Sequence, residues 1–229
     1  MVQTARERAR EALTADIVET ARGQLAEVGA AALSLRAVAR ELGLASSAVY
    51  RYVPSRDDLL TRLLVAGYAS LGAAAEDADD PGLAPRGRWV AVSRGVRAWA
   101  LAHPHEWALL YGSPVPGYAA PQDTVVAAMR SAGVFGRVLG DAARSGGLVG
   151  RTPDADRTPL VGPDVGPVLG GEHPALDDDV RARAVLAWSS TLGLVSAELF
   201  GHLVGVTTDQ DAFFTEQVGR LADLVGLMG

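Results

Sequence analysis

Apolar side chains recur at helical spacing just before a glycine at position 43. Four of them fall at i, i+3, i+4 and i+7, the pattern of one buried helix face: Leu35, Val38, Ala39 and Leu42. Ser34 precedes this stretch, in the position where an N-cap side chain accepts a hydrogen bond from the first turn. Gly43 follows it, where a left-handed backbone ends a helix and turns the chain. The pattern predicts a short amphipathic helix that starts after Ser34 and stops at Gly43.

A second short helix is predicted almost at once. Ser46 or Ser47 is in position to cap it, and Val49 and Val53 would face inward. Pro54 ends it, because proline cannot continue a helix. Two helices joined by about three residues that include glycine describe a helix-turn-helix.

Longer helices flank this pair. Residues 6–28 carry one apolar face and end at Gly29; that face consists of Leu13, Ile17, Ala21, Leu25 and Val28. Ser55 is placed as the N-cap of another helix over residues 56–75, whose apolar face consists of Leu59, Leu60, Leu63, Leu64 and Leu71. We expect the first of these helices to pack across the helix-turn-helix.

The middle of the chain predicts three more helical stretches. One begins near Pro85 with inward positions at Trp89, Val92, Val96 and Trp99. A short helix over residues 106–111 precedes a loop over 112–121. Residues 123–145 form the third stretch, with inward candidates Val126, Met129, Val134 and Val138. The 32 residues from 146 to 177 contain seven glycines and five prolines, which predicts a long loop.

The last two predicted helices share a heptad rhythm. Acidic residues at 177–179 favour the first helix start, and its seam alternates steps of three and four: Val185, Trp188, Leu192, Val195, Leu199, His202 and Val206. Thr208 or Asp209 caps the second helix, whose seam is Phe214, Val218, Leu221, Val225 and Met228. Two such seams suit a four-helix bundle made by two copies of the chain, or else a core within one chain.

The composition argues against several kinds of chemistry. The chain has no cysteine, so it has no disulfide or thiolate site, and all 21 basic residues are arginine, so it has no P-loop or Schiff-base lysine. Its four histidines lack metal-ligand spacing, and no nucleophile elbow or acid/base pair is visible. We therefore expect no enzyme activity, cofactor or metal. The charged N-terminus and the lack of an apolar run of about 18 residues argue against a signal peptide or membrane span, which predicts a cytoplasmic protein.

The net charge of −6 is unevenly distributed along the chain. The stretch through Arg62 carries nine arginines and eight acidic residues, a net charge of about +1, whereas the remainder carries about −7. An acidic body is compatible with a small DNA-binding domain, because such a domain needs only a local cationic face.

The stretch from Gly43 to Leu59 resembles the N-terminal DNA-binding domain of the TetR family of bacterial repressors. That family commonly has the pattern Gly-Val-Ser-x-x-x-Leu-Tyr-x-His-Phe-x-Ser-Lys-x-x-Leu here. This chain departs from it at Ala45, where the family often has Ser or Thr, and at Tyr52 and Val53, where it often has His and Phe. Residues 103–118 resemble the C-terminal ligand domain of an actinobacterial-type branch of the same family.

The resemblance implies that the second helix of the motif enters the major groove while flanking groups hold phosphates. The groove-facing set is then Ala45, Ser46, Ser47 and Arg51. The phosphate-facing set is Ser34, Tyr50, Tyr52 and Arg56. Arg51 is the candidate for base discrimination, because a guanidinium can pair with guanine through two hydrogen bonds. Two alternatives stay open, since Arg51 also fits a solvated surface position and Tyr52 a core position.

The resemblance also implies an effector pocket in the larger domain. Eight residues are candidates to line it: Trp89, Trp99, Trp107, Tyr111, Tyr118, Phe135, Trp188 and Glu198. The aromatic residues fit a plain core equally well. Members of this branch often carry a Trp-His-Gly signature near Trp188, and this chain has Leu192 where the histidine would stand. Glu198 and His202 lie on or beside the heptad seam, where a polar group needs a partner.

The last two helices usually form the dimer interface in the family. Nine residues are predicted for it: Val185, Leu192, Val195, Leu199, His202, Phe214, Val218, Leu221 and Val225.

These features predict an all-α protein with two domains, residues 1–55 for a three-helix helix-turn-helix domain and residues 56–229 for effector binding and dimerisation. We expect a homodimeric repressor that binds a pseudo-palindromic double-stranded operator and is released by a small apolar effector. The alternative is a helical ligand-binding or scaffold protein whose N-terminal motif does not bind DNA. No membrane partner is expected.

Overall fold

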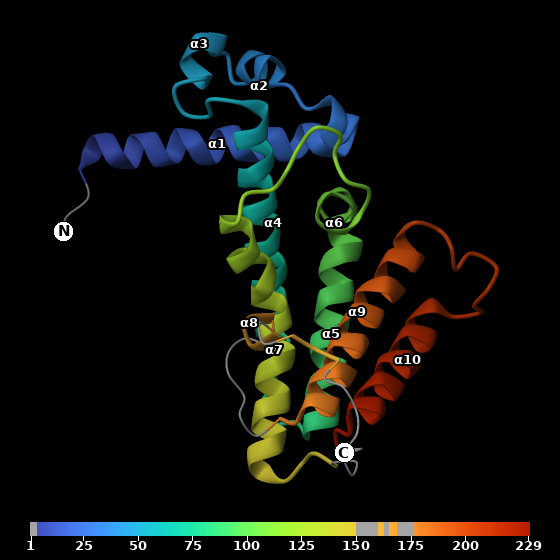
Figure 1. Cartoon of the computed structure of the whole chain (residues 1–229). Helices are drawn as coiled ribbons and strands as arrows, with labels where there is room; N and C mark the ends of the chain where they lie inside the picture. The colour runs from blue at the N-terminus through green and yellow to red at the C-terminus, as the bar shows by residue number, and fades with distance from the viewer. Residues whose placement is uncertain (1–3, 150–159, 163–164, 169–175) are drawn as a thin grey trace. The chain divides into compact units, whose positions relative to one another are not determined.

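The computed structural model describes residues 4–149, 160–162, 165–168 and 176–229. Its helices are α1 (Ala5–Val28), η1 (Ala30–Ala32), α2 (Leu35–Glu41), α3 (Ser46–Val49), α4 (Arg56–Asp77), α5 (Pro85–Ala102), α6 (Pro104–Tyr111), α7 (Asp123–Ser145), α8 (Val165–Val168), α9 (Asp178–Leu199) and α10 (Gln210–Val225) (Figure 1). The described residues form no strand, and an isolated bridge pairs Leu148 with Leu227. The all-α prediction is confirmed. Most of the predicted loop over 146–177 lies outside the described residues.

The chain divides into two compact units. The first unit comprises the described residues up to Gly67 together with His103–Val125, and the second comprises Tyr68–Ala102 and the described residues from Val126 onward. Two of the crossings between the units fall inside continuous helices, α4 and α7. The predicted division at Arg56 follows the functional halves of the family, whereas the compact units divide within α4, and α6 joins the first unit.

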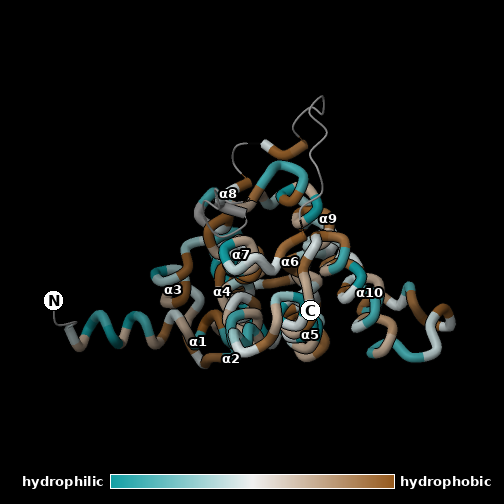
Figure 2. Tube along the Cα trace, turned by 90° about the horizontal axis from the view of Figure 1, so that it is seen from below, coloured by the Kyte–Doolittle hydropathy of each residue, from teal (hydrophilic) through white to brown (hydrophobic). Residues whose placement is uncertain are grey.

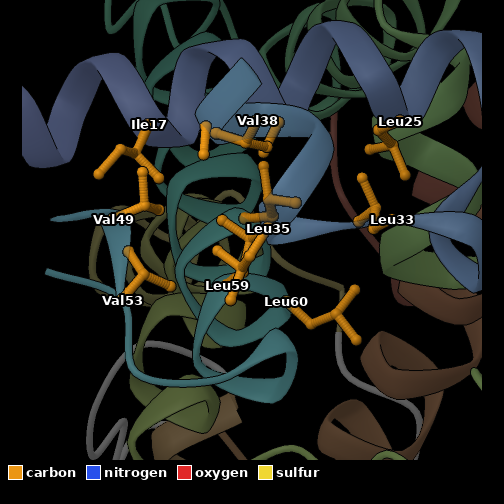
Figure 3. Packing of buried hydrophobic residues seen from close by; sticks show 12 residues of the cluster. Ile17, Leu25, Leu33, Leu35, Val38, Val49, Val53, Leu59 and Leu60 are labelled. Atoms are coloured by element: carbon orange, nitrogen blue, oxygen red, sulfur yellow. The ribbon is translucent and has the colours of Figure 1, made fainter. Parts of the chain in front are cut away.

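The core of the first unit is built from the predicted apolar faces. Its buried members come from α1, α2, α3 and α4 and point into one interior (Figure 3); they include Ile17, Ala21, Leu25, Leu35, Val38, Val49, Val53, Leu59 and Leu60. Burying one such side chain fully contributes roughly 1.5–3 kcal/mol. Val28 is the exception, because it is 52% exposed at the last position of α1, so its predicted burial is wrong.

The second unit buries most of the predicted faces of α5 and α10 and part of that of α7. On α9 the prediction is largely wrong, because Val195 is buried but Val185, Leu192 and Leu199 are half-buried, and the buried positions include Ala184, Ala187 and Thr191. Trp89 meets Phe135 edge to face, with ring centroids 4.6 Å apart. Val134 and Val138 are buried on α7 as predicted, but Val126 is 78% exposed near the start of that helix. Helix α10 packs against both α5 and α9, so three helices share this part of the core.

A buried ion-pair network also holds the second unit. The Arg88 guanidinium donates to both Asp79 oxygens, at 2.7 and 2.9 Å, and to Asp141 Oδ2 at 2.8 Å. Arg137 Nε donates to Asp79 Oδ2 at 3.2 Å. Burial raises the pKa of Asp79, but the hydrogen bonds and charges of Arg88 and Arg137 outweigh it and hold the pKa below its usual range.

The ends of α9 and α10 follow local capping rules. Asp177 accepts a hydrogen bond from Val180 N, and Asp209 accepts one from Ala212 N, so both predicted helix starts are confirmed. Helix α9 stops at Leu199, close to Gly201, whose φ of 79° interrupts the helix. The predicted continuation of the seam through His202 and Val206 is therefore wrong, and both side chains are exposed beyond the helix.

No helix in the described part of the chain has the length and apolar character needed to cross a membrane. The same residues contain no group of three or more histidine, aspartate or glutamate side chains arranged to hold a metal ion.

Candidate nucleic-acid interface

The turn between α2 and α3 is fixed by a Schellman motif. Leu44 N donates to Ala39 O at 2.8 Å, and Gly43 N donates to Arg40 O at 3.2 Å. Gly43 has φ 67°, the left-handed conformation that a glycine adopts without a Cβ penalty. The predicted role of Gly43 in ending α2 is confirmed, and the turn aims α3 away from α2.

The starts of α2 and α3 differ from the sequence prediction in their caps. Ser34 occupies the N-cap of α2, but its hydroxyl makes no capping hydrogen bond. Ala45, which has no side-chain acceptor, occupies the N-cap of α3, so Ser46 is the first helical residue and neither predicted serine caps the helix. The N-cap of α3 thus lies one residue before Ser46, the earlier of the two predicted caps.

Helix α3 presents a buried side and an exposed side. Val49 is fully buried, as is Val53 in the turn that follows the helix. Ala45, Ser47 and Arg51 are exposed, Tyr50 is 42% exposed, and Ser46 is half-buried. The predicted inward and outward positions are thus confirmed, and the outward positions form a small polar surface around α3.

Tyr52 belongs to the interior rather than to this exposed surface. It is half-buried and packs against the core of the first unit. The Arg10 guanidinium lies over its ring, 5.5 Å from the centroid. The packing of the Tyr52 ring favours the core alternative, and the phosphate contact of Tyr52 stays a prediction.

Arg56 also has a structural role that the sequence did not reveal. Its Nη2 donates to the carbonyl oxygens of Ala30 and Ala31, at 2.9 and 3.0 Å. These bonds tie the start of α4 to η1 through Nη2, and the phosphate contact of Arg56 stays a prediction. Ser55 caps α4 as predicted, since its Oγ accepts from Asp58 N at 3.0 Å.

Three exposed arginines surround the motif without a carboxylate partner. Arg36, Arg40 and Arg51 form no ion pair with any residue that the structure describes. In the second unit, by contrast, Arg86, Arg88, Arg97 and Arg130 each bind a carboxylate. Arg36 and Arg40 were missed in the sequence, although their spacing of four residues places them together on the polar face of α2.

The predicted pocket residues are divided between the two units. Trp107, Tyr111 and Tyr118 lie in the first unit, and Tyr118 Oη is 2.8 Å from Thr61 Oγ1. The other five predicted residues lie in the second unit: Trp89, Trp99, Phe135, Trp188 and Glu198.

Glu198 is already occupied by an internal partner. Arg97 donates to both of its carboxylate oxygens, at 2.7 and 2.8 Å, and also to Asp211 Oδ1 at 2.7 Å. The same guanidinium lies over the Phe214 ring, 5.2 Å from the centroid. The predicted need of Glu198 for a partner is therefore met within the chain. Trp99 is similarly satisfied, because its Nε1 donates to Ser70 Oγ at 2.9 Å.

Several buried polar atoms of the second unit have no hydrogen-bond partner among the described residues, and three of them belong to helices α5, α7 and α9. They are Trp89 Nε1 on α5, Ser131 Oγ on α7 and Trp188 Nε1 on α9. A buried polar group without a partner costs roughly 1–3 kcal/mol. Ser131 was missed in the sequence, since a lone serine in a helix gives no signal of burial.

The predicted dimer-interface set is partly internal. Val195, Phe214, Val218 and Val225 are at most 2% exposed within a single chain, so they cannot supply an interface directly. Val185, Leu192, Leu199 and Leu221 are half-buried, and His202 is exposed beyond α9. Contacts of α10 with α5 and α9 of the same chain bury Phe214, Val218 and Val225, whereas most of the predicted α9 positions stay partly accessible.

A different face of α9 and α10 is open. A groove of about 580 Å³ runs between them, lined by Ser190, Gly193, Leu194, Ala197, Phe213, Gln217, Arg220, Leu221 and Leu224. Leu221 alone among these belongs to the predicted set. The two helices lie side by side along this groove (Figure 1).

Two family models match the chain. The model described as bacterial regulatory proteins, tetR family, matches residues 17–63. The model described as tetracyclin repressor-like, C-terminal domain, matches residues 89–221. The first match covers the helix-turn-helix and the second covers most of the second unit.

Individual relatives agree with these models. HTH-type transcriptional regulator Rv1816 of Mycobacterium tuberculosis is 44% identical over 224 residues, covering 93% of this chain and 92% of the relative. HTH-type transcriptional regulator Mb1846 of Mycobacterium bovis matches to the same extent. The solved structure of SCO4313 is 30% identical, covers 96% of this chain and 100% of its own, and superposes with a TM-score of 0.76.

Proposed function

Because the chain belongs to the TetR family of DNA-binding transcriptional regulators, we propose that it acts as a homodimeric repressor that a small ligand releases from its operator. The observation that carries the DNA-binding part is the polar surface around α3, flanked by three exposed arginines without carboxylate partners. Such arginines are available to phosphates and base edges.

Individual roles follow from position. Arg51, exposed at the end of α3, would pair with a guanine, and Ser47 would contact neighbouring base edges. Arg36, Arg40 and Tyr50 would hold phosphates on either side, where they fix the register without reading sequence. Ala45, Ser46 and Ser34 complete the surface with small groups that allow close approach of the backbone.

The test is binding of the purified protein to the DNA that flanks its own coding sequence, at two salt concentrations. The Arg51→Ala variant should lose discrimination at one base position by about 1–3 kcal/mol, roughly 5- to 150-fold in relative affinity. Arg94→Ala, which removes an exposed arginine of α5 in the second unit, is the matched control and should bind as the parent does. Unchanged discrimination in the Arg51 variant would refute the assigned role.

The proposed dimer would use the outward groove between α9 and α10 rather than the buried seam. The groove has apolar walls, and Leu186 and Leu224 add exposed apolar surface on the same two helices. Two such faces placed against each other would form a four-helix bundle related by a two-fold axis. A two-fold protein matches a pseudo-palindromic site, because each half-site then meets the same surface.

A glycine in the groove offers a clean test of this interface. A Cβ at Gly193 would meet no atom within 4 Å, so the single chain can accept a side chain there. Gly193→Arg should therefore remain folded but shift the molar mass in light scattering from dimer to monomer. Ala98→Arg, at an exposed position on α5, is the control and should remain dimeric. A dimeric Gly193→Arg protein would exclude this face.

The proposed effector is a small, largely apolar molecule with hydrogen-bond acceptors. The support is three of the unpartnered donors of the second unit, Trp89 Nε1, Trp188 Nε1 and Ser131 Oγ, each of which a ligand acceptor would satisfy. A ligand that prefers one arrangement of the dimer changes DNA affinity by its differential binding energy, and DNA changes ligand affinity by the same factor.

Ligand screening by thermal shift would test the effector proposal. A ligand at 100 times its Kd should stabilise the protein by about 2.7 kcal/mol. Ligands that carry a hydrogen-bond acceptor should raise the melting temperature more than their hydrocarbon analogues do. Ser131→Ala should reduce this difference in melting temperature. If every ligand that demonstrably binds leaves the operator affinity unchanged, release by ligand is refuted.

A further inference from the structure

Helix α1 begins well before it meets the rest of the first unit. The residues from Thr4 to Ala12 are all exposed, and the first fully buried position is Ile17. At 1.5 Å per residue, the exposed helical part from Ala5 to Ala12 extends for about 12 Å. This projecting end of α1 runs on past α2 and α3 (Figure 1) and is largely hydrophilic (Figure 2).

The projecting end is organised by its own first turn. Thr4 N donates to Glu7 Oε2 at 2.7 Å, and Glu7 N donates to Thr4 Oγ1 at 3.2 Å, which together form a capping box. These bonds to Thr4 also lower the pKa of the Glu7 carboxyl. The helix therefore starts at a defined residue, and the Glu7 charge is engaged at the cap.

The three arginines of the projecting end lie on two opposite faces of α1. Arg6 and Arg10 are one turn apart, on the side of α1 that continues to Leu13 and Ile17. This side of α1 faces the residues that follow α3, because the Arg10 guanidinium lies over the ring of Tyr52. Arg8 lies on the opposite side of the same helix. Arg6 is thus aligned with the helix-turn-helix one turn beyond Arg10.

The projecting end leaves Arg6 without an anionic partner among the described residues. Like charges four residues apart destabilise a helix, and neither Arg6 nor Arg8 forms an ion pair with a described residue. Arg6 gains nothing from the fold that would offset the repulsion from Arg10. A line of phosphates along this face would turn the repulsion into attraction.

We propose that the projecting end of α1 is a second DNA-binding element, in which Arg6 contacts the phosphodiester backbone beside the groove that α3 enters. The proposal rests on the proposed DNA-binding function of the first unit. Arg10, held against Tyr52, positions the helix, and Arg6 supplies the contact. The contact is to phosphate, so it adds affinity without reading sequence.

The comparison of Arg6→Ala with Arg8→Ala tests this directly. Both variants remove one exposed arginine from the same projecting helix, so they share any general effect of net charge. Affinity for an operator duplex is measured by fluorescence anisotropy over a series of salt concentrations. Arg6→Ala should weaken binding roughly fivefold near physiological salt, equally on all sequences, and reduce the salt slope by about 1. Arg8→Ala should leave the slope unchanged.

A second readout is the length of the duplex. Base pairs beyond the recognised site should strengthen binding of the parent and of Arg8→Ala, but not of Arg6→Ala. Equal losses in the two variants, or no loss in either, would overturn the proposal while the parent still binds its operator. A parent protein that binds no DNA would instead refute the function itself, and circular dichroism of both variants shows whether α1 is intact.

Discussion

Asp79 binds two guanidinium groups in the second unit, and its side chain is only 4% exposed. Asp79→Asn would leave the largely buried Arg88 with Asp141 as its remaining carboxylate partner. We expect it to lower the free energy of unfolding by about 3 kcal/mol, since breaking a buried pair leaves an uncompensated charge. Glu216→Gln breaks the exposed pair with Arg220 and should change the same quantity by less than about 0.5 kcal/mol. Urea denaturation measures both, and equal effects would contradict the assigned role of burial.

Acid should destabilise the fold through the same groups. The pKa values of Glu76, Asp79 and Asp223 are held below their usual range, Glu76 and Asp223 chiefly by hydrogen bonds from Arg130 and Arg86, and Asp79 by Arg88 and Arg137 against its burial. A carboxyl with a lowered folded pKa stabilises the protein above its unfolded pKa, and this contribution is lost as the pH falls through the folded value. We therefore expect the free energy of unfolding to decline below about pH 4, with a smaller decline in Asp79→Asn. An identical decline in both proteins would show that Asp79 is not one of the groups involved.

Neighbouring residues of one kind had roles that the sequence could not separate. Arg51 and Arg56 are both arginines of the same motif, but Arg56 binds carbonyl oxygens of η1, 25 and 26 residues earlier in the chain. Tyr50 and Tyr52 divide in the same way, one exposed and one packed on the core. The partner that decides each role comes from a distant segment of the chain. The spacing of neighbouring residues therefore cannot predict it.

Two helical glycines should respond to alanine in opposite directions. A Cβ at Gly95 in α5 would lie 2.5 Å from Ala78 Cβ and 3.0 Å from Ala74 O, so Gly95→Ala should cost about 2 kcal/mol through overpacking. A Cβ at Gly23 in α1 would meet nothing within 4 Å, so Gly23→Ala should stabilise by about 0.5–1 kcal/mol. Thermal unfolding of the two variants checks the signs, and a stabilising Gly95→Ala would contradict the close approach of α4 and α5.

The elements themselves were largely predictable. The apolar faces of α2, α4 and α5 and the caps at Ser55, Asp177 and Asp209 follow from local rules, and the structure agrees. The seam of α9 and α10 marks the limit of such rules. On α10 the periodicity identified buried positions, but on α9 the buried positions include Ala184, Ala187 and Thr191, which lie beside the predicted seam. Periodicity also does not tell whether a helix face is covered by its own chain or by a second copy.

The first unit depends on a segment that is distant in sequence. Leu109, Val115 and Tyr118 pack against its core, and Arg22 Nε lies 3.3 Å from Oε2 of the buried Glu106, although the two are not aligned as a hydrogen bond. A boundary drawn from the motif alone leaves residues 103–125 out of this unit, because motif patterns describe consecutive residues.

A fragment that ends at Gly67 should therefore be less stable than the same residues in the whole chain. It lacks α6 and the loop that follows, and with them the apolar cover of α1 and α4. We expect a broad thermal transition by circular dichroism, at a lower temperature than the first unit shows in the full protein. A sharp transition at the same temperature would mean that residues 103–125 are dispensable for this fold.

The cationic surface around α3 is made of arginine alone, in a chain without lysine. A guanidinium keeps its proton at any pH a cell survives, and it has no amine that an acetyl group could neutralise. Alkaline pH and lysine acetylation can each neutralise the positive charge of lysine side chains. Neither can therefore remove the positive charge of this arginine surface. Occupancy of a target site would then be governed by geometry and ligand, with the charge of the surface held constant.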